Sequence, residues 1–103
     1  MSAPIIVTGT IDFDPDHHDD AVAAAKVVMA ITAQEAGCEM YVMAADLSDR
    51  GRFHLSERWT DAESLAEHAK GAHLKDFGRA LRAAGAKGNS ITRWDGATGS
   101  KLA

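Results

Sequence analysis

The sequence predicts a single α+β domain, in which four strands form an antiparallel sheet and helices cover one of its faces. Three observations predict this class. The chain has 103 residues, which is the size of one domain. Segments with the two-residue periodicity of strands alternate with segments that have the three- and four-residue spacing of helices. Their order along the chain is strand, helix, strand, strand, helix, strand.

The first strand is predicted over residues 5–13, where the odd positions are apolar or glycine and most even positions are polar. Asp14-Pro15-Asp16 ends this strand. The following helix is predicted to run through an alanine-rich stretch to Ala36, with Gly37 as its C-terminal stop. Three acidic residues at its start complement the positive end of the helix dipole: Asp16, Asp19 and Asp20.

Two further strands, over residues 39–47 and 52–59, are predicted to form a hairpin. They are joined by Ser48-Asp49-Arg50-Gly51, a short segment of turn-forming residues. The two strands should therefore be antiparallel neighbours in the sheet.

The second helical region is predicted to begin at Thr60, which precedes Glu63 by three residues as in a capping box. This region pauses at Gly71 and continues from about His73 to Ala84. The last strand is predicted over residues 90–94, so that the domain spans residues 1–95 and residues 96–103 form a flexible tail. The complete order is that of the split βαβ, or ferredoxin-like, folds.

The sheet is predicted to have apolar side chains on both faces, although helices cover only one. In the strand over residues 39–47, one face carries Met40, Val42 and Ala44, and the other carries Tyr41, Met43 and Leu47. An exposed apolar patch on a stable protein usually marks an interface. We therefore expect a homodimer that associates through the sheet faces.

The composition excludes several classes of partner. The formal net charge of −4 does not provide the basic surface that nucleic-acid binding or an anionic membrane requires. No segment is long and apolar enough for a signal peptide or a membrane span. The single cysteine, Cys38, cannot form an intramolecular disulfide, so we expect a cytoplasmic protein.

His68 is the candidate catalytic residue. It follows Leu65 by three residues and precedes Ala72 by four, so it lies on the apolar stripe of its helix and should face a core or a pocket. The usual pKa of histidine, near 6.5, suits a general base at neutral pH. The alternative is a histidine at the edge of the core that bonds a backbone carbonyl.

Four further residues are candidates for contacts with a substrate. Glu57 and Trp59 share one strand face, and Glu57 is either functional or paired with an arginine such as Arg93 or Arg58 of the partner subunit. Tyr41 and Trp59 are either core aromatics or substrate contacts. Gly9, opposite an alanine-rich helix, leaves either space for a planar ligand or close packing.

No metal site is predicted. The Asp14–Asp20 segment is interpreted as a solvated helix start, because its adjacent histidines point to different sides of a helix. His68 and His73 are five residues apart with Gly71 between them, which is not the spacing that places two imidazoles on one helical face.

The chain resembles the antibiotic biosynthesis monooxygenase family, whose members are dimeric α/β barrels built from the ferredoxin-like unit. Three segments carry the resemblance: Glu35-Ala36-Gly37-Cys38 with Tyr41; Phe53-His54-Leu55-Ser56-Glu57-Arg58-Trp59; and Leu65, His68, His73, Leu74 and Phe77. The resemblance implies a pocket between sheet and helices in each subunit. It also implies oxidation of phenolic, quinol or polyketide-like aromatic compounds by O2 without metal, flavin or haem.

A related branch of the family degrades haem, and this chain departs from its motif. That branch has asparagine, tryptophan and histidine where this sequence has Gly9, His68 and Gly78. Gly78 offers no axial ligand to iron, so haem degradation is not expected. Two hypotheses follow: a cofactor-independent monooxygenase, or a non-catalytic protein that binds a small aromatic ligand.

Overall fold

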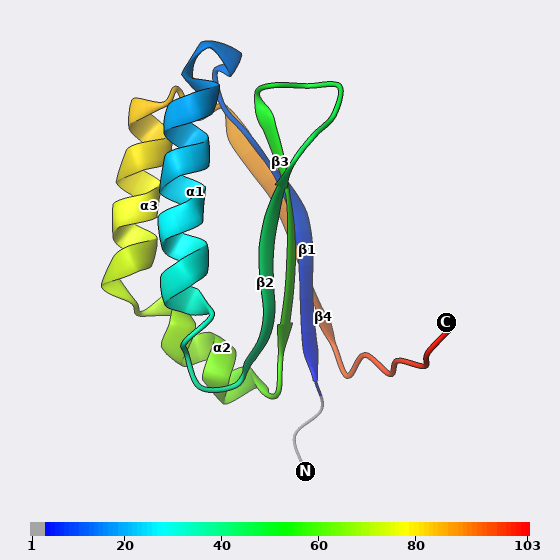
Figure 1. Cartoon of the computed structure of the whole chain (residues 1–103). Coiled ribbons are helices and arrows are strands. Elements are labelled where there is room, and N and C mark those ends of the chain that lie inside the picture. Colours follow the sequence, from blue (N-terminus) through cyan, green and yellow to red (C-terminus); the bar gives the residue numbers. More distant parts are fainter. Residues whose placement is uncertain (1–3) are drawn as a thin grey trace.

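The computed structural model describes residues 4–103, and it confirms the predicted ferredoxin-like fold. Four antiparallel strands form one sheet in the order β2-β3-β1-β4: β1 (Ile5–Asp12), β2 (Cys38–Ala45), β3 (Arg52–Trp59) and β4 (Gly88–Asp95). Three α-helices, α1 (His18–Thr32), α2 (Ala62–Ala69) and α3 (Ala72–Ala83), lie on one face of the sheet (Figure 1). A short 3-10 helix, η1 (Pro15–His17), connects β1 to α1.

The core lies between the sheet and the helices. Alternate residues of β1 and β3 are buried, as the two-residue period requires when helices cover one face. Trp59 and Phe13 are among the largest side chains that are fully buried. Helix α1 contributes Ala21, Ala25 and Val28, whose short side chains allow it to pack closely on the sheet.

Helix α1 ends earlier than predicted. Its last residue is Thr32 rather than Ala36, and a series of turns continues to Gly37. Gly37 has a φ of 79°, a left-handed conformation that favours glycine. The residues between the helix and β2 therefore form a loop, which places Glu35 beside α2 and α3.

Three other predicted boundaries also differ. β2 ends at Ala45, so Leu47 lies in the following loop, fully exposed, and does not face the core. The N-cap of α2 is Asp61 rather than Thr60, because the Asp61 carboxylate accepts a hydrogen bond of 2.7 Å from the Ser64 amide. β4 begins at Gly88 and ends at Asp95, so it is longer than the predicted strand.

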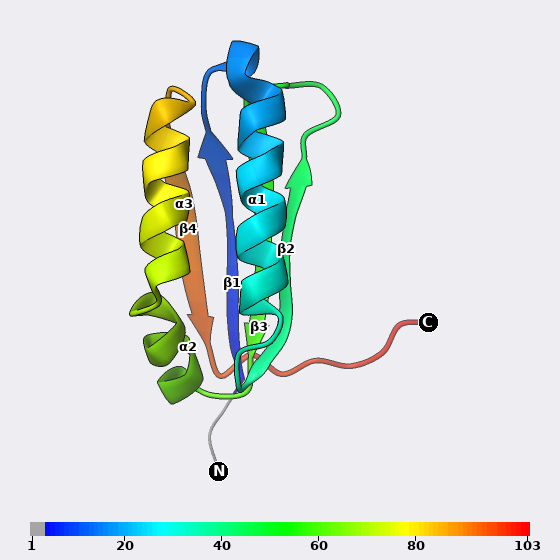
Figure 2. The same ribbon diagram turned by 60° about the vertical axis from the view of Figure 1, so that its left-hand side comes forward.

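The helices lie in front of the sheet in Figure 2, and the side view in Figure 1 shows that the other face of the sheet has no helix over it. Val42 on β2 is 39% exposed and Trp94 on β4 is 55% exposed. The Trp94 indole nitrogen donates a hydrogen bond of 3.0 Å to the Thr8 hydroxyl, which holds the ring against β1. The expected apolar residues on this face are thus present, mixed with polar ones.

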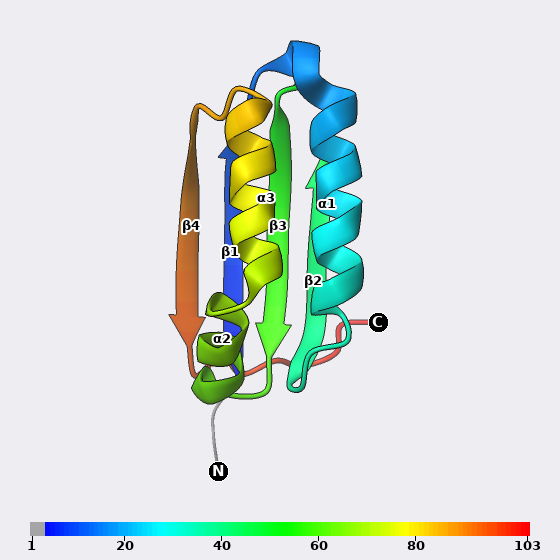
Figure 3. The ribbon, with the colours of Figure 1, turned by 90° about the vertical axis from the view of Figure 1, so that its left-hand side faces the viewer.

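Strand β4 lies at the edge of the sheet, outside the two long helices (Figure 3). Every residue of this strand is exposed to some degree, including Ile91 at 46%. None of the helices in residues 4–103 is long and apolar enough to cross a membrane.

Gly9 allows β4 to approach β1 closely. A Cβ atom on Gly9 would lie 2.3 Å from the carbonyl oxygen of Ser90 and 2.8 Å from Cα of Ile91. Gly9→Ala should therefore destabilise the protein by about 1–3 kcal/mol, because the two strands must separate. Gly78→Ala is the matched control, since its Cβ would meet only Arg82 at 3.6 Å.

Alanine in the interior of α3 should stabilise that control variant by about 0.5–1 kcal/mol. Urea denaturation of both variants measures the two free energies of unfolding. Equal stability of Gly9→Ala and the native protein would show that the strand contact tolerates a methyl group.

Candidate functional site

A cavity of about 440 Å³ lies between the sheet and the helices α2 and α3. Most of its wall is apolar, with side chains such as Val7, Leu55 and Phe77. Three side chains with polar or ionisable groups also line it: Tyr41, Glu57 and His68. An apolar cavity with a few convergent polar groups is the usual form of a small-molecule site.

His68 is held at the wall of this cavity by a carboxylate. Its side chain is only 5% exposed, and its Nδ1 lies 3.2 Å from both carboxylate oxygens of Glu35. Such a contact favours the proton on Nδ1, directed at the carboxylate, and leaves Nε2 as the ring nitrogen that can accept a proton. The predicted inward position is therefore present, but the partner is a carboxylate rather than a backbone carbonyl.

Two aromatic rings fix the plane of the imidazole. The Trp59 ring centroid lies 4.7 Å from that of His68, and the Tyr41 centroid lies 5.2 Å from it. Trp59 is completely buried and does not line the cavity. It supports His68 from behind, so its position is not that of a direct substrate contact.

Glu57 is buried and is bonded to Trp59. The Trp59 indole nitrogen donates a hydrogen bond of 2.8 Å to Glu57 Oε1. Burial raises the pKa of Glu57, while the hydrogen bond from Trp59 and the nearby His68 act in the opposite direction. The carboxyl group therefore holds its proton more tightly than an exposed glutamate does.

The arginine partners considered for Glu57 have other partners in this chain. Arg93 pairs with Asp95 at 2.6 Å, and Arg58 pairs with Glu39 at 3.5 Å. The alternative in which Glu57 pairs with Arg93 is therefore not found in this chain. The two residues are in register with the same residue, Val7, but β1 separates β3 from β4 in the sheet.

Tyr41 is the cross-strand neighbour of Glu57 in the register of β2 and β3. Burial raises the pKa of its hydroxyl well above the usual range, and the carboxylates of Glu57 and Glu35 add to the effect. The hydroxyl is therefore neutral at physiological pH and can donate a hydrogen bond. Gly9, in contrast, does not line the cavity, since β4 fills the space beside it.

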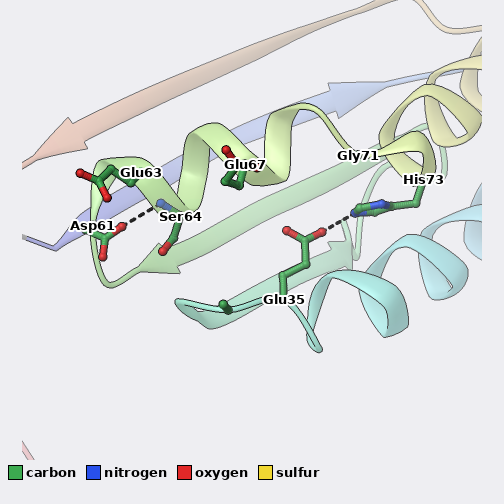
Figure 4. Close-up of a pocket in the computed structure, with 8 residues that line it drawn as sticks. Glu35, Asp61, Glu63, Ser64, Glu67, Gly71 and His73 are labelled. Atoms are coloured by element: carbon green, nitrogen blue, oxygen red, sulfur yellow. Dashed lines mark hydrogen bonds and ion pairs between the residues drawn. The ribbon is translucent and has the colours of Figure 1, made fainter.

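Glu35 also contacts a second histidine, on the far side from the apolar cavity. His73 Nε2 lies 2.5 Å from Glu35 Oε1 (Figure 4). The ring centroids of His68 and His73 are 5.7 Å apart. The break of the helix at Gly71 was predicted, but the direction that it gives to His73 was not. The helix is interrupted between Ala69 and Ala72, and His73 follows this break with its ring beside that of His68.

The roles of Glu35 and His73 in this cluster were not foreseen from the sequence. Two features of the sequence could have indicated the cluster: a histidine on each side of Gly71, and a glutamate two residues before Gly37. A second cavity of about 510 Å³ opens beside Glu35 and His73. His68 lines the apolar cavity and Glu35 lines the second cavity, so the contact between these two side chains lies between the two cavities.

Replacing Glu57 by glutamine tests the burial of this carboxyl group. The folded protein binds the Glu57 proton more tightly than the unfolded chain, whose pKa has the usual value. The contribution of Glu57 to the free energy of unfolding therefore falls as the pH rises from the unfolded pKa through the folded pKa. Glu57→Gln keeps an oxygen for the Trp59 hydrogen bond and cannot ionise.

The variant should gain stability relative to the native protein on going from about pH 4 to about pH 7. Urea denaturation of both proteins at the two pH values measures this gain. A difference in stability that does not change with pH would show that Glu57 ionises as readily as an exposed residue.

The sheet order, the helices on one face and the largely apolar cavity between them define a ferredoxin-like α+β protein with an internal cavity. The sequence matches the antibiotic biosynthesis monooxygenase family over residues 4–80. The chain therefore belongs to this family, which places it among monooxygenases at the family level.

Solved structures of other proteins have the same fold. A protein from Deinococcus radiodurans, described as a candidate antibiotic biosynthesis monooxygenase, has 22% identity and a TM-score of 0.87, covering 96% of this chain and 98% of its own. A protein from Pseudomonas aeruginosa has 27% identity and a TM-score of 0.82, with coverages of 92% and 95%. A further such candidate, from Caulobacter crescentus, has 20% identity and a TM-score of 0.84, with coverages of 94% and 92%. No curated protein matches the sequence.

Proposed function

We propose that the protein is a cofactor-independent monooxygenase that oxidises a phenolic, quinol or polyketide-like aromatic compound with O2 in the apolar cavity. One observation carries the proposal: a buried histidine, oriented by a carboxylate, lies at the wall of a cavity large enough for an aromatic ring system. Family membership supports the reaction class.

His68 is the proposed catalytic base. Nε2 accepts the phenolic proton, and the Glu35 carboxylate stabilises the imidazolium that forms. The substrate anion then transfers one electron to O2, and the resulting radical pair combines to form a carbon–oxygen bond. The peroxide anion takes the proton back from Nε2, which regenerates the base. The hydroperoxide then loses water, so one oxygen atom becomes a carbonyl of the product and the other leaves as H2O. The substrate supplies all four electrons, and no external reductant is needed.

Tyr41 and Glu57 are the proposed substrate-binding residues. The neutral Tyr41 hydroxyl can donate a hydrogen bond to a substrate oxygen. Glu57, oriented by Trp59, accepts or donates a second bond according to its protonation. Trp59 and Gly9 contribute indirectly, Trp59 by supporting His68 and Gly9 by allowing β4 to close the sheet beside the cavity.

Oxygen consumption with a small panel of hydroquinones and anthrones tests the proposal, using chelator-treated protein. We expect uptake above the rate without protein for at least one compound. Saturable binding of these compounds without any oxygen uptake would instead identify the protein as a ligand-binding member of the family.

We also propose that two copies associate through the sheet face that has no helices. Exposed Val42 and Trp94 on this face support the proposal, as does membership of a typically dimeric family. Sedimentation equilibrium should give twice the chain mass of 10.9 kDa. Val42→Lys should shift the equilibrium to the monomer, while Leu47→Lys, in an exposed loop, should not. A monomeric native protein would overturn the proposal.

We also propose a cytoplasmic location, which the single cysteine supports, since a chain with one cysteine has no intramolecular disulfide to maintain. Cys38 is half-buried, and burial raises the pKa of its thiol, so it is not a reactive thiolate.

A further inference from the structure

Glu35, His68 and His73 place three metal-ligating atoms close together. Among residues 4–103, each of these side chains offers a ligand atom that lies within 4.8 Å of the other two. His68 Nδ1 is 3.2 Å from the Glu35 oxygens. Two ligands on a tetrahedral Zn²⁺ ion are about 3.3 Å apart when each bond is about 2.0–2.1 Å. The His68–Glu35 distance already matches this spacing, whereas the Glu35–His73 contact of 2.5 Å must open for an ion to lie between the two groups.

His73 Nε2 makes a close but misaligned contact in the cluster. It is buried and lies 2.5 Å from Glu35 Oε1, without the N–H···O alignment of a hydrogen bond. A misaligned contact in a buried site leaves part of the hydrogen-bonding capacity unused, and an ion bound by both groups would recover it. The side chains of the cluster are 5%, 14% and 21% exposed, so the site is largely shielded from water.

The cavity beside the cluster favours the entry of a cation. Four carboxylates line it, from Glu35, Asp61, Glu63 and Glu67, and none of its lining residues is lysine or arginine (Figure 4). Glu67 is paired with Lys70, and Asp61 caps α2, so the wall keeps a net negative charge. A cleft lined by one sign of charge concentrates ions of the opposite sign.

We propose that Glu35, His68 and His73 bind one divalent transition-metal ion, which enters from the acidic cavity. Two neutral imidazoles and one carboxylate are typical ligands of Zn²⁺ and neighbouring first-row ions, and they leave a position open toward the cavity. Ca²⁺ and Mg²⁺ prefer sites made only of oxygen ligands and do not fit this set.

This inference goes beyond the proposed oxidation and competes with it for one side chain. A metal ion on Nδ1 of His68 leaves the ring proton on Nε2, which can then no longer accept a proton from a phenol. Zinc should therefore inhibit oxygen uptake by the native protein. The two proposals can fail separately, because zinc binding is measured without any substrate.

The test is a calorimetric titration of chelator-treated protein with Zn²⁺. We expect one ion per chain, and at least a tenfold loss of affinity in both His73→Gln and Glu35→Gln. His54→Gln is the matched control, since it also removes an imidazole that lies 2.7 Å from a carboxylate, that of Asp46, but in an exposed pair elsewhere. This control should bind zinc as the native protein does.

A spectroscopic measurement separates ligand loss from misfolding. Nitrogen NMR of labelled histidine should show zinc-dependent shifts for His68 and His73, and no shift for His54. Three results would each overturn the proposal: no stoichiometric binding, unchanged affinity in both His73→Gln and Glu35→Gln, or an equal loss of affinity in His54→Gln.

Discussion

Replacing His68 by alanine should lower the turnover of the proposed oxidation by about 10²–10⁴-fold, the usual contribution of a general base. The variant removes the group that accepts the phenolic proton and leaves the other side chains that line the cavity in place. The measurement is the initial rate of oxygen uptake per folded molecule, with a substrate that the native protein turns over.

Stability must be measured on the same preparation, because His68 is also part of the packing. A residue that is merely structural would show the reverse result: a loss of about 1–3 kcal/mol in the free energy of unfolding, with activity per folded molecule retained. That result would remove His68 from the catalytic mechanism. His68→Gln keeps more of the side-chain volume, and it should lose activity to a similar degree.

The strand pattern was sufficient to predict the sheet and its buried face. Residues 52–59 alternate in the structure as they do in the sequence, with Phe53, Leu55, Glu57 and Trp59 buried. A shift of one residue would place all four on the other face, so a sheet covered on one side specifies this register strongly. The same reasoning placed His68 inward, since a helix on a sheet must bury its apolar stripe.

The contacts of Glu35 depend on tertiary structure that no periodic pattern encodes. Its position results from the end of α1 at Thr32 and from the loop to Gly37, whereas the sequence favoured helix as far as Ala36. Alanine has a high helix propensity, but propensity is overridden where the chain must turn back to the sheet. His73 contacts the cluster because of the break before α3, which the sequence predicted at Gly71, although the direction of the His73 side chain after this break depends on tertiary structure.

Gly9 is a position at which the sequence alone could not separate two structural roles. Its place in the alternating pattern indicated a small side chain on the inner face, and the sequence left open whether the space served a ligand or close packing. The structure shows close packing, with the backbone of β4 where a side chain would lie. The alternation of residues within one strand carries no information on how closely the neighbouring strand approaches it.

Trp59 is the side chain on which the site depends most for its stability. It is completely buried, its ring supports His68, and its indole nitrogen donates to the buried Glu57. Trp59→Ala should reduce the free energy of unfolding by about 3–5 kcal/mol, because it leaves a large cavity in the core. The loss of the hydrogen bond adds to this, since a buried carboxyl group then lacks its donor.

Trp59→Phe separates the two effects. Phenylalanine keeps an aromatic ring in the core and removes only the indole donor and part of the volume, so the expected loss is about 1–3 kcal/mol. It should also raise the pKa of Glu57 further, because the hydrogen bond from Trp59 lowers it in the native protein. Urea denaturation of the two variants at pH values on both sides of the carboxyl range measures both effects. If Trp59→Ala is no less stable than Trp59→Phe, the packing of this ring does not hold the site together.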